Sequence, residues 1–374
     1  MSRPVHGGNL AWAAALAECT PAELLDFSAS ISPLGPPCCV REAVQADFLS
    51  VRAYPDPGYG ELKQAIAQHH QISSEYVMPG NGAAELITWA ARDLARLQAC
   101  FCLSPGFSDY DRALSAFGCR PVGLSLFVNA ESWEHLLFSQ ALDRALDLKR
   151  CGLLLNNPHN PTGKLFDRAR VRSLLGKLGL VVVDEAFMDF LPPGRSQSVI
   201  DWVAEFENLV VIRSLTKFYS MPGLRLGYAI AQPETLKRWE QWRDPWSVNT
   251  LAISAGIAAL QDVAFQQKTW SWLATASEQL YKGLSALSGV VPMPSCANFF
   301  LVKCKKSVVA LQAALLKQHR IYIRDCMSFE GLGDRYFRVA VKLPEDNLRL
   351  IRAIAAVWPD LPEPDLPGTN TDGR

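Results

Sequence analysis

The residue best placed for chemistry is Lys217, which follows an apolar segment in the run RSLTKFY. Two hydroxyls precede it, those of Ser214 and Thr216, and Arg225 follows eight residues later. Hydroxyls and a guanidinium bind a phosphate well, and an arginine can do so through two parallel hydrogen bonds. A lysine amine forms Schiff bases with carbonyl compounds. The combination predicts a cofactor that carries both an aldehyde and a phosphate, as pyridoxal 5′-phosphate (PLP) does.

A second candidate is Asp184, which ends the apolar run LVVVD. Alone, an acid at a strand end could be a metal ligand, a helix cap or a general base. Beside PLP it has a sharper role, because a carboxylate facing the pyridine nitrogen keeps that nitrogen protonated and the ring electron-accepting. Since Lys217 follows the next predicted strand, we expect this role.

Three weaker signals surround these two residues. The run NNPHNPTG contains two Asn–Pro steps and a glycine, which form a rigid turn. It is either a plain loop or the segment from which Asn160 donates a hydrogen bond to the phenolic oxygen of the cofactor. GNGAAE at 80–85 predicts a helix N-terminus, where free N–H groups and the helix dipole favour an anion. Phe107 is either a core aromatic or a ring that lies flat on the pyridine.

The elements that must position these residues form an α/β pattern. Four apolar runs predict buried strands of a mainly parallel sheet: 99–105, 151–158, 180–187 and 208–215. Three of them end in polar residues, and ligands of open α/β sheets gather at the carboxyl ends of strands. Segments 61–70 and 247–289 predict helices. Short strands between helices after about residue 296 predict a second, α+β part.

The chain length of 374 residues predicts a large domain with a smaller one. We assign 1–40 to an N-terminal arm that forms part of the small domain. We expect the first fifty residues to be irregular apart from a short helical stretch that ends at Leu16. Residues 41–275 are assigned to the large cofactor-binding domain, 276–360 to the small C-terminal domain, and 361–374 to a flexible tail.

Bulk composition narrows the class of protein further. Basic and acidic residues number 37 each, so no basic field indicates a nucleic-acid partner. The ten cysteines form no CxxC pair, which argues against a zinc site and for free thiols in a reducing compartment. No signal peptide and no membrane-spanning run are predicted. We therefore expect a cytoplasmic protein without a metal or a membrane partner.

The motifs NPHNPTG, DEAF, SLTKF and GLRLGY, in this order, resemble those of fold-type-I PLP enzymes of the histidinol-phosphate aminotransferase group. More narrowly, the chain is similar to the L-threonine-O-3-phosphate decarboxylase family of cobalamin biosynthesis. That narrower resemblance is carried by HGGN at 6–9, LDFSASISPLGPP at 25–37, YPDP at 54–57, PWSVN at 245–249, IYIRDC at 321–326 and YFRVAVK at 336–342.

The resemblance implies a role for each candidate. Lys217 would carry the Schiff base, Asp184 would face the pyridine nitrogen, Asn160 would bind the phenolic oxygen and Phe107 would stack on the ring. The cofactor phosphate would be held by Ser214, Thr216, Arg225 and the N–H groups of Ala83 and Ala84.

The resemblance also implies partners. Tyr54 would reach the cofactor phosphate of a neighbouring subunit, which implies a homodimer with shared active sites. Arg338 would bind the substrate carboxylate, and Arg324 and His6 the phosphate of a small phosphorylated amino acid.

Two departures from the family patterns bear on the reaction. Aminotransferases of this group usually have tyrosine where this chain has Phe187, and the lost hydroxyl favours the decarboxylase. The decarboxylase pattern usually has asparagine where this chain has Ser30 and Ser32.

We expect decarboxylation of L-threonine O-3-phosphate to (R)-1-amino-2-propanol O-2-phosphate and CO2. The alternative is histidinol-phosphate aminotransferase or a related aminotransferase. A candidate of another class is a non-catalytic PLP-binding regulator, which usually carries an added DNA-binding domain.

Overall fold

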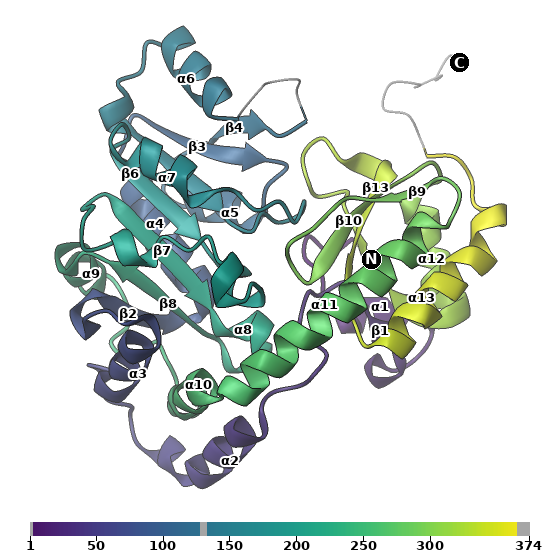
Figure 1. Cartoon of the computed structure of the whole chain (residues 1–374), viewed down its shortest axis with the longest axis horizontal. Coiled ribbons are helices and arrows are strands. Elements are labelled where there is room, and N and C mark those ends of the chain that lie inside the picture. The colour runs from purple at the N-terminus through teal and green to yellow at the C-terminus, as the bar shows by residue number, and fades with distance from the viewer. Residues whose placement is uncertain (1–2, 128–132, 365–374) are drawn as a thin grey trace. The chain divides into compact units, whose positions relative to one another are not determined.

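A computed structural model describes residues 3–127 and 133–364, and within them the chain divides into two compact units (Figure 1). The larger unit comprises Ile31–Leu273 and Cys296–Asn298. The smaller unit comprises the chain up to Ser30, Ala274–Ser295 and the segment from Phe299 onward. The segment 31–40, assigned to the arm from sequence, groups with the larger unit.

The larger unit is built on a seven-stranded sheet with the order β2-β8-β7-β6-β5-β3-β4 (Figure 1). All neighbouring pairs are parallel except that β8 runs antiparallel to both β2 and β7. The predicted mainly parallel α/β fold is therefore confirmed. The strands are β2 (Val77–Asn81), β3 (Ala99–Ser104), β4 (Val122–Ser125), β5 (Cys151–Asn156), β6 (Leu180–Asp184), β7 (Leu209–Ser214) and β8 (Leu226–Ala231).

The inner strands are rich in leucine and valine because both of their faces are covered. Every residue of β5, β7 and β8 is buried. On one face, apolar side chains of α4, α5 and α9 pack on the sheet and form one core. The helices of this unit are α2 (Cys38–Ala46), α3 (Gly60–His70), α4 (Gly82–Leu94), α5 (Asp109–Ser115), α6 (Trp133–Asp143), α7 (Arg168–Leu175), α8 (Leu215–Phe218), α9 (Pro233–Glu240) and α10 (Thr250–Gln261).

Two helical segments differ from the expectation. The first fifty residues contain the amphipathic helix α2, which begins after Pro37 without a side-chain cap and so lacks the usual sequence signal. The predicted helix 247–289 is two helices, α10 and α11 (Val263–Ser285), which are separated at Asp262. The Asp262 side chain accepts a hydrogen bond from the Phe265 amide, 2.8 Å away, and so caps the second helix.

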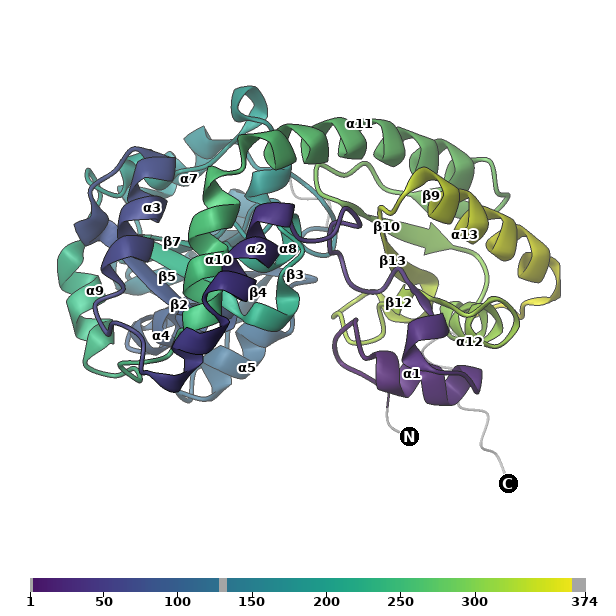
Figure 2. The same ribbon diagram turned by 90° about the horizontal axis from the view of Figure 1, so that it is seen from below.

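The smaller unit holds an antiparallel sheet with the order β12-β13-β10-β9 and a parallel pair, β1 with β11. The helix α12 packs against both α1 and α13 (Figure 2). Its elements are α1 (Leu10–Ala17), β1 (Leu25–Asp26), β9 (Val290–Pro292), β10 (Phe299–Cys304), α12 (Val308–His319), β11 (Ile321–Tyr322), β12 (Arg324–Asp325), β13 (Tyr336–Ala340) and α13 (Pro344–Val357).

The start of the predicted tail is bound to the smaller unit. The Leu361 carbonyl accepts a hydrogen bond from Lys306 Nζ at 2.6 Å, and the Pro362 carbonyl accepts one from the Ser307 amide at 2.9 Å. The rest of that tail, residues 365–374, lies outside the described residues. Within the described ranges, no helix is long and apolar enough to cross a membrane.

Candidate functional site

Polar side chains from neighbouring strands meet at the carboxyl edge of the large sheet. Asn156 at the end of β5 is the register partner of Asp184 at the end of β6. Ser214 ends β7, and the next residues form the short helix α8, which carries Lys217. Side chains alternate along a strand, so Asp184 and Ser214 share the face of Val182 and Ile212, which belong to the core under α4 and α5. The structure thus brings the strand-end candidates to one edge.

The Asp184 carboxylate lies in a buried, hydrogen-bonded environment. Tyr110 Oη donates to its Oδ2 at 2.6 Å, and the Ala186 amide donates to its Oδ1 at 3.0 Å. Burial raises the pKa of Asp184, while these hydrogen bonds and the charge of Lys217 act in the opposite direction. A cationic N–H group placed opposite Asp184 would stabilise the ionised form of this buried carboxylate.

Tyr110 was not among the predicted site residues. It lies three residues after Phe107, and the two rings meet edge-on with centroids 5.5 Å apart. Phe107 lies just before α5, and its carbonyl accepts a hydrogen bond from the Tyr110 amide at 3.1 Å, so the short spacing of the two aromatic residues was the available signal. The structure therefore adds Tyr110 to the group around Asp184.

The loop after β5 is fixed by its own asparagines. Asn156 donates through Nδ2 to the Asp184 carbonyl at 2.9 Å and accepts from the Asn160 amide through Oδ1 at 2.7 Å. Asn157 bonds both backbone groups of Phe166 through its side chain. Asn160, which is buried, is thereby held next to the end of β6.

An anion cradle lies between the start of α4 and the end of β7. The hydroxyl oxygens of Ser214 and Thr216 are 2.8 Å apart, and both residues are buried. Gly82, the first residue of α4, has φ +73°, and a Cβ there would collide with the guanidinium of Arg225. That guanidinium therefore occupies the space a side chain would fill, beside the free amides of the first helical turn, which includes Ala83 and Ala84.

A second glycine permits this close approach. A Cβ on Gly227 in β8 would lie 2.6 Å from the Ala83 amide nitrogen and 2.7 Å from the Arg213 carbonyl oxygen. Two hydroxyls, one guanidinium and a helix N-terminus fit a phosphate group. The lysine amine and buried carboxylate at the same edge fit the aldehyde and ring nitrogen of a pyridine aldehyde.

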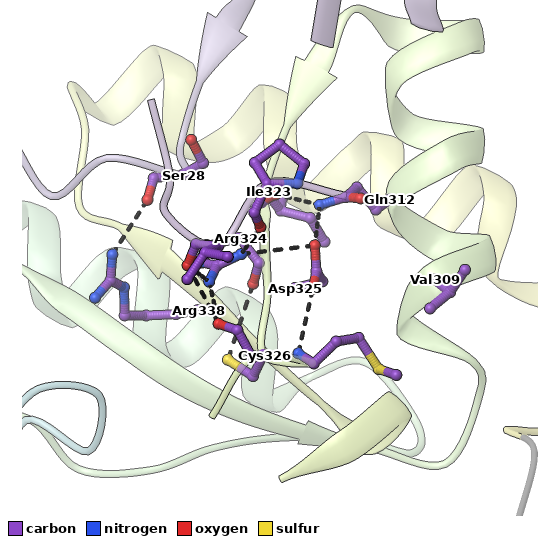
Figure 3. A network of polar contacts seen from close by, with 12 residues as sticks. Ser28, Val309, Gln312, Ile323, Arg324, Asp325, Cys326 and Arg338 are labelled. Atoms are coloured by element: carbon purple, nitrogen blue, oxygen red, sulfur yellow. Dashed lines mark hydrogen bonds and ion pairs between the residues drawn. The ribbon is translucent and has the colours of Figure 1, made fainter. Parts of the chain in front are cut away.

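The three predicted substrate residues lie in the smaller unit. Arg324 on β12 and Arg338 on β13 are register partners, so their guanidiniums come from facing positions (Figure 3). Arg338 donates through Nη2 to the Ser28 carbonyl at 3.2 Å, and burial lowers the pKa of Arg338 to about 10. A bound anion would offset this burial of positive charge.

Arg324 also positions the N-terminal segment. It donates to the Pro4 carbonyl at 3.2 Å, to the Val5 carbonyl, and to Ser328 Oγ at 2.5 Å. These contacts hold the chain next to His6, which is exposed. One carboxylate, that of Asp325, lies 3.8 Å from Arg324 Nη1 (Figure 3).

The remaining predicted residues have distinct surroundings. Tyr54 is 80% exposed on the larger unit, and its ring contacts that of Trp246 with centroids 4.6 Å apart and planes tilted by 31°. The Ser32 amide donates to the Lys217 carbonyl at 3.0 Å, whereas Ser30 Oγ is buried with no hydrogen-bond partner among the described residues. Phe187 is buried beside Phe190.

The described residues were also searched for side chains that could bind a metal ion. Over residues 3–127 and 133–364, no group of three or more histidine, cysteine, aspartate or glutamate side chains is arranged to hold a metal ion.

Comparisons with known proteins agree with this geometry. The chain is 39% identical to the threonine-phosphate decarboxylase of Salmonella typhimurium, over 94% of this chain and 96% of that one. It is 32% identical to an adenosylcobalamin biosynthesis bifunctional protein of Leptospira interrogans, over 96% of this chain and 41% of that protein. The structure of histidinol-phosphate aminotransferase from Clostridium acetobutylicum superposes with a TM-score of 0.82 at 27% identity, covering 90% of this chain and 100% of that one.

The family assignment follows from a match over most of the chain. Residues 22–354 match the model of aminotransferase class I and II, a range that includes every strand of the large sheet. The resemblance inferred from the motifs is confirmed: this chain belongs to the aminotransferase class I and II family.

Proposed function

We propose that this chain is a PLP-dependent decarboxylase that converts L-threonine O-3-phosphate to (R)-1-amino-2-propanol O-2-phosphate and CO2 in cobalamin biosynthesis. The observation that carries the proposal is the 39% identity to a threonine-phosphate decarboxylase over nearly the full length of both chains. The similarity to an adenosylcobalamin biosynthesis protein supports the pathway.

The cofactor would be held by the larger unit. Lys217 Nζ binds its aldehyde, Ser214, Thr216, Arg225 and the amides of Ala83 and Ala84 bind its phosphate, Asn160 donates to its phenolic oxygen and Phe107 covers its ring. The Asp184 carboxylate holds a proton on the pyridine nitrogen, and the Tyr110 hydroxyl keeps that carboxylate in place.

When bound, the cofactor draws electrons from the α-carbon of an amino acid, so that bonds at this carbon break more easily. The protein must then select which bond breaks, and it does so by orienting the substrate. Arg338 holds the carboxylate, while Arg324 and His6 hold the phosphate at the other end. Two fixed ends leave the amino acid one orientation.

The second candidate is histidinol-phosphate aminotransferase, because a solved enzyme of that name shares the fold at 27% identity. The residue Phe187 argues against this candidate. Histidinol-phosphate aminotransferases usually have a tyrosine at this position, and the buried Phe187 lacks its hydroxyl.

The deciding experiment uses purified holoprotein, L-threonine O-3-phosphate and no keto acid. Release of CO2 with formation of the amino-alcohol phosphate supports the proposal. A strict requirement for 2-oxoglutarate would establish the aminotransferase instead. Lys217→Ala should abolish turnover, whereas Lys164→Ala, at an exposed lysine, should not.

The same sample tests the non-catalytic alternative. A lysine-bound cofactor gives a visible absorption band that changes when an amino-acid substrate is added. A protein that binds PLP, shows no spectral response and releases no CO2 would be the regulator.

Assembly into a homodimer is the next part of the proposal. Phe48, Leu49, Val51 and Tyr54 are all more than half exposed, and Trp246 is 43% exposed. Exposed apolar side chains grouped in this way are typical of protein interfaces. A second copy would cover them and receive Tyr54 at its cofactor phosphate.

Light scattering of the eluting protein should give the mass of a dimer. Tyr54→Phe should keep the dimer and weaken cofactor retention, because only the hydroxyl is lost. A monomeric holoenzyme with full activity would exclude the shared site.

We propose the cytoplasm as the compartment. All ten cysteines are free thiols, as expected of a reducing environment. Cell fractionation with activity assays checks this.

A further inference from the structure

The buried serine Ser28, which lies two residues after strand β1, makes contacts through both its main chain and its side chain. Its carbonyl oxygen accepts a hydrogen bond from Arg338 Nη2 at 3.2 Å (Figure 3). Its hydroxyl oxygen accepts a hydrogen bond from the Gly8 amide at 2.8 Å. One residue therefore contacts both the arginine expected to bind the substrate carboxylate and the N-terminal segment that contains His6.

The carboxylate of Asp26 fixes the direction of the second contact. Asp26 Oδ1 accepts a hydrogen bond from the Ser28 amide at 2.7 Å and another from the Ser28 hydroxyl at 2.6 Å. Because a hydroxyl has a single hydrogen, its donation to Asp26 leaves the Ser28 oxygen as an acceptor. The Gly8 amide meets that acceptor, and the backbone at residue 8 is thereby held in place.

The two glycines of the HGGN motif permit this contact. A Cβ on Gly7 would collide with the Ser28 carbonyl oxygen, so any side chain there would force the segment away from Ser28. Gly8 has φ +80°, which residues with a Cβ rarely adopt. The motif therefore lets the backbone of residues 7–8 lie directly against Ser28.

A second group of hydrogen bonds holds the same segment on the other side of His6. Arg324 donates to both carbonyls of the segment 4–5, one of them at 3.2 Å. Arg324 is also the register partner of Arg338. His6 thus lies between two fixed points, and each of them is linked to Arg338, one through Ser28 and the other through the pairing of β12 with β13.

We propose that Ser28 is a positioning residue that sets the separation between Arg338 and the segment 6–8, and thereby the length of the substrate that the chain accepts. This inference rests on the proposed function, in which Arg338 binds the carboxylate and His6 the phosphate. The carbonyl and the hydroxyl of one residue are covalently joined, so the two groups that they hold cannot move apart while both hydrogen bonds persist.

Such a fixed separation selects among phosphorylated amino acids. L-threonine O-3-phosphate carries its phosphate on the β-carbon, whereas O-phospho-L-homoserine carries it on the γ-carbon and is one methylene longer. Binding groups held at one spacing orient the shorter molecule correctly and misplace the longer one, and misplacement lowers the rate. The wild-type holoprotein should therefore prefer the β-phosphorylated substrate.

The test compares Ser28→Ala with Ser28→Thr, which keeps a hydroxyl, in purified holoprotein. CO2 release gives kcat/KM for L-threonine O-3-phosphate and for O-phospho-L-homoserine. Ser28→Ala should lower the value for the shorter substrate about tenfold, the size of one lost hydrogen bond, and should reduce the preference over the longer substrate. Ser28→Thr should retain most of both. An unchanged preference in Ser28→Ala would contradict the proposal.

Binding of L-threonine, which has the carboxylate but no phosphate, separates positioning from general damage to the fold. The hydrogen bond from Arg338 to the Ser28 carbonyl does not need the hydroxyl. The L-threonine concentration that gives half of the change in cofactor absorbance should therefore be the same in Ser28→Ala and in the wild type. Equal losses for L-threonine and for its phosphate would show a merely structural role and would sink the proposal.

A second variant changes the same contact from the other side. Gly7→Ala places a methyl group against the Ser28 carbonyl, and the partly exposed segment should move away. We expect the same loss with L-threonine O-3-phosphate and unchanged binding of L-threonine. Gly194→Ala, where a Cβ would meet nothing within 4 Å, is the matched control. Wild-type kinetics in Gly7→Ala would count against the proposal.

Failure of this inference is distinguishable from failure of the proposed function. A wild-type holoprotein that released no CO2 from L-threonine O-3-phosphate would overturn both. A wild-type holoprotein that released CO2, together with a Ser28→Ala variant of equal activity and equal preference, would overturn only the role of Ser28.

Discussion

Each unit of the molecule buries an arginine, and the pKa values of the two arginines shift in opposite directions. Arg213 in the larger unit lies between Glu185, 2.9 Å away, and Asp189, which also forms an ion pair with it. These carboxylates outweigh burial and raise the pKa of Arg213. In the smaller unit burial, together with the positive charge of Arg324, outweighs the effects of Cys326 and Asp26 and lowers the pKa of Arg338 to about 10.

The difference distinguishes a charge that is neutralised within the fold from a charge that a bound anion would stabilise. Arg213 stands one residue before Ser214, but it points to the opposite face of the sheet and serves the fold. Arg338 lies on a strand that faces Arg324, and an anion between the two guanidiniums would recover what burial has cost. The predictions below test this division.

The largest expected effect is on folding. Arg213→Met leaves Glu185 and Asp189 without their buried cation and should lower the free energy of unfolding by about 3–5 kcal/mol. Denaturant unfolding measures it. Arg172→Met removes an exposed pair with Glu205 and should cost about 1 kcal/mol or less. Adding Glu185→Gln and Asp189→Asn to Arg213→Met should recover part of the loss; no recovery would contradict the assignment.

The next effect is on activity. Arg338→Met should leave the unfolding free energy unchanged or slightly higher, since it removes a charge that burial disfavours. It should lower kcat/KM for L-threonine O-3-phosphate about 100-fold or more, because charge-assisted hydrogen bonds to the carboxylate are lost. Steady-state CO2 release and thermal unfolding are measured together. Arg335→Met, at an exposed arginine of the same unit, is the control. If Arg338→Met lowered the free energy of unfolding as much as Arg213→Met does, the distinction between the two arginines would be wrong.

A smaller effect concerns Asp184 and pH. Because burial raises the folded-state pKa of Asp184, its ionised form is disfavoured in the fold. Asp184→Asn should therefore stabilise cofactor-free protein at neutral pH by about 0.5–2 kcal/mol. As pH falls through the raised pKa, the wild-type carboxyl takes up a proton and the difference should vanish. Thermal unfolding between pH 4 and 8 checks this, with exposed Asp143→Asn giving a flat response.

The smallest effect is stabilisation by a free anion. Inorganic phosphate should raise the unfolding free energy of holoprotein by about 1 kcal/mol at a few times its dissociation constant. Arg338→Met should abolish this gain and Arg335→Met should retain it. Equal gains in both variants would place the anion elsewhere.

Much of the larger unit could be predicted because its strands are continuous apolar runs that end in polar residues. The predicted runs at 151–158, 180–187 and 208–215 contain β5, β6 and β7, and the register of β5 with β6 sets Asn156 opposite Asp184. Strand β8 was not singled out from the sequence. It runs antiparallel to β2, which precedes it by almost 150 residues, and no local pattern indicates that pairing.

The rest of the site depends on contacts that span long stretches of sequence. Tyr110 reaches Asp184 across 74 residues, and nothing at either position specifies the partner. The two carboxylates that surround Arg213, Glu185 and Asp189, likewise become its neighbours only when β6 and β7 pair. The facing arginines of the smaller unit were individually visible, but their shared register was not.

The contact between Gly82 and Arg225 bears on how sequences of this fold can change over time. Any side chain at position 82 would meet an unfavourable backbone angle and evict the guanidinium, and without the guanidinium a vacancy would open beside the helix start. A substitution at either position alone is unfavourable, so we expect Gly82 and Arg225 to be retained or replaced together in related sequences.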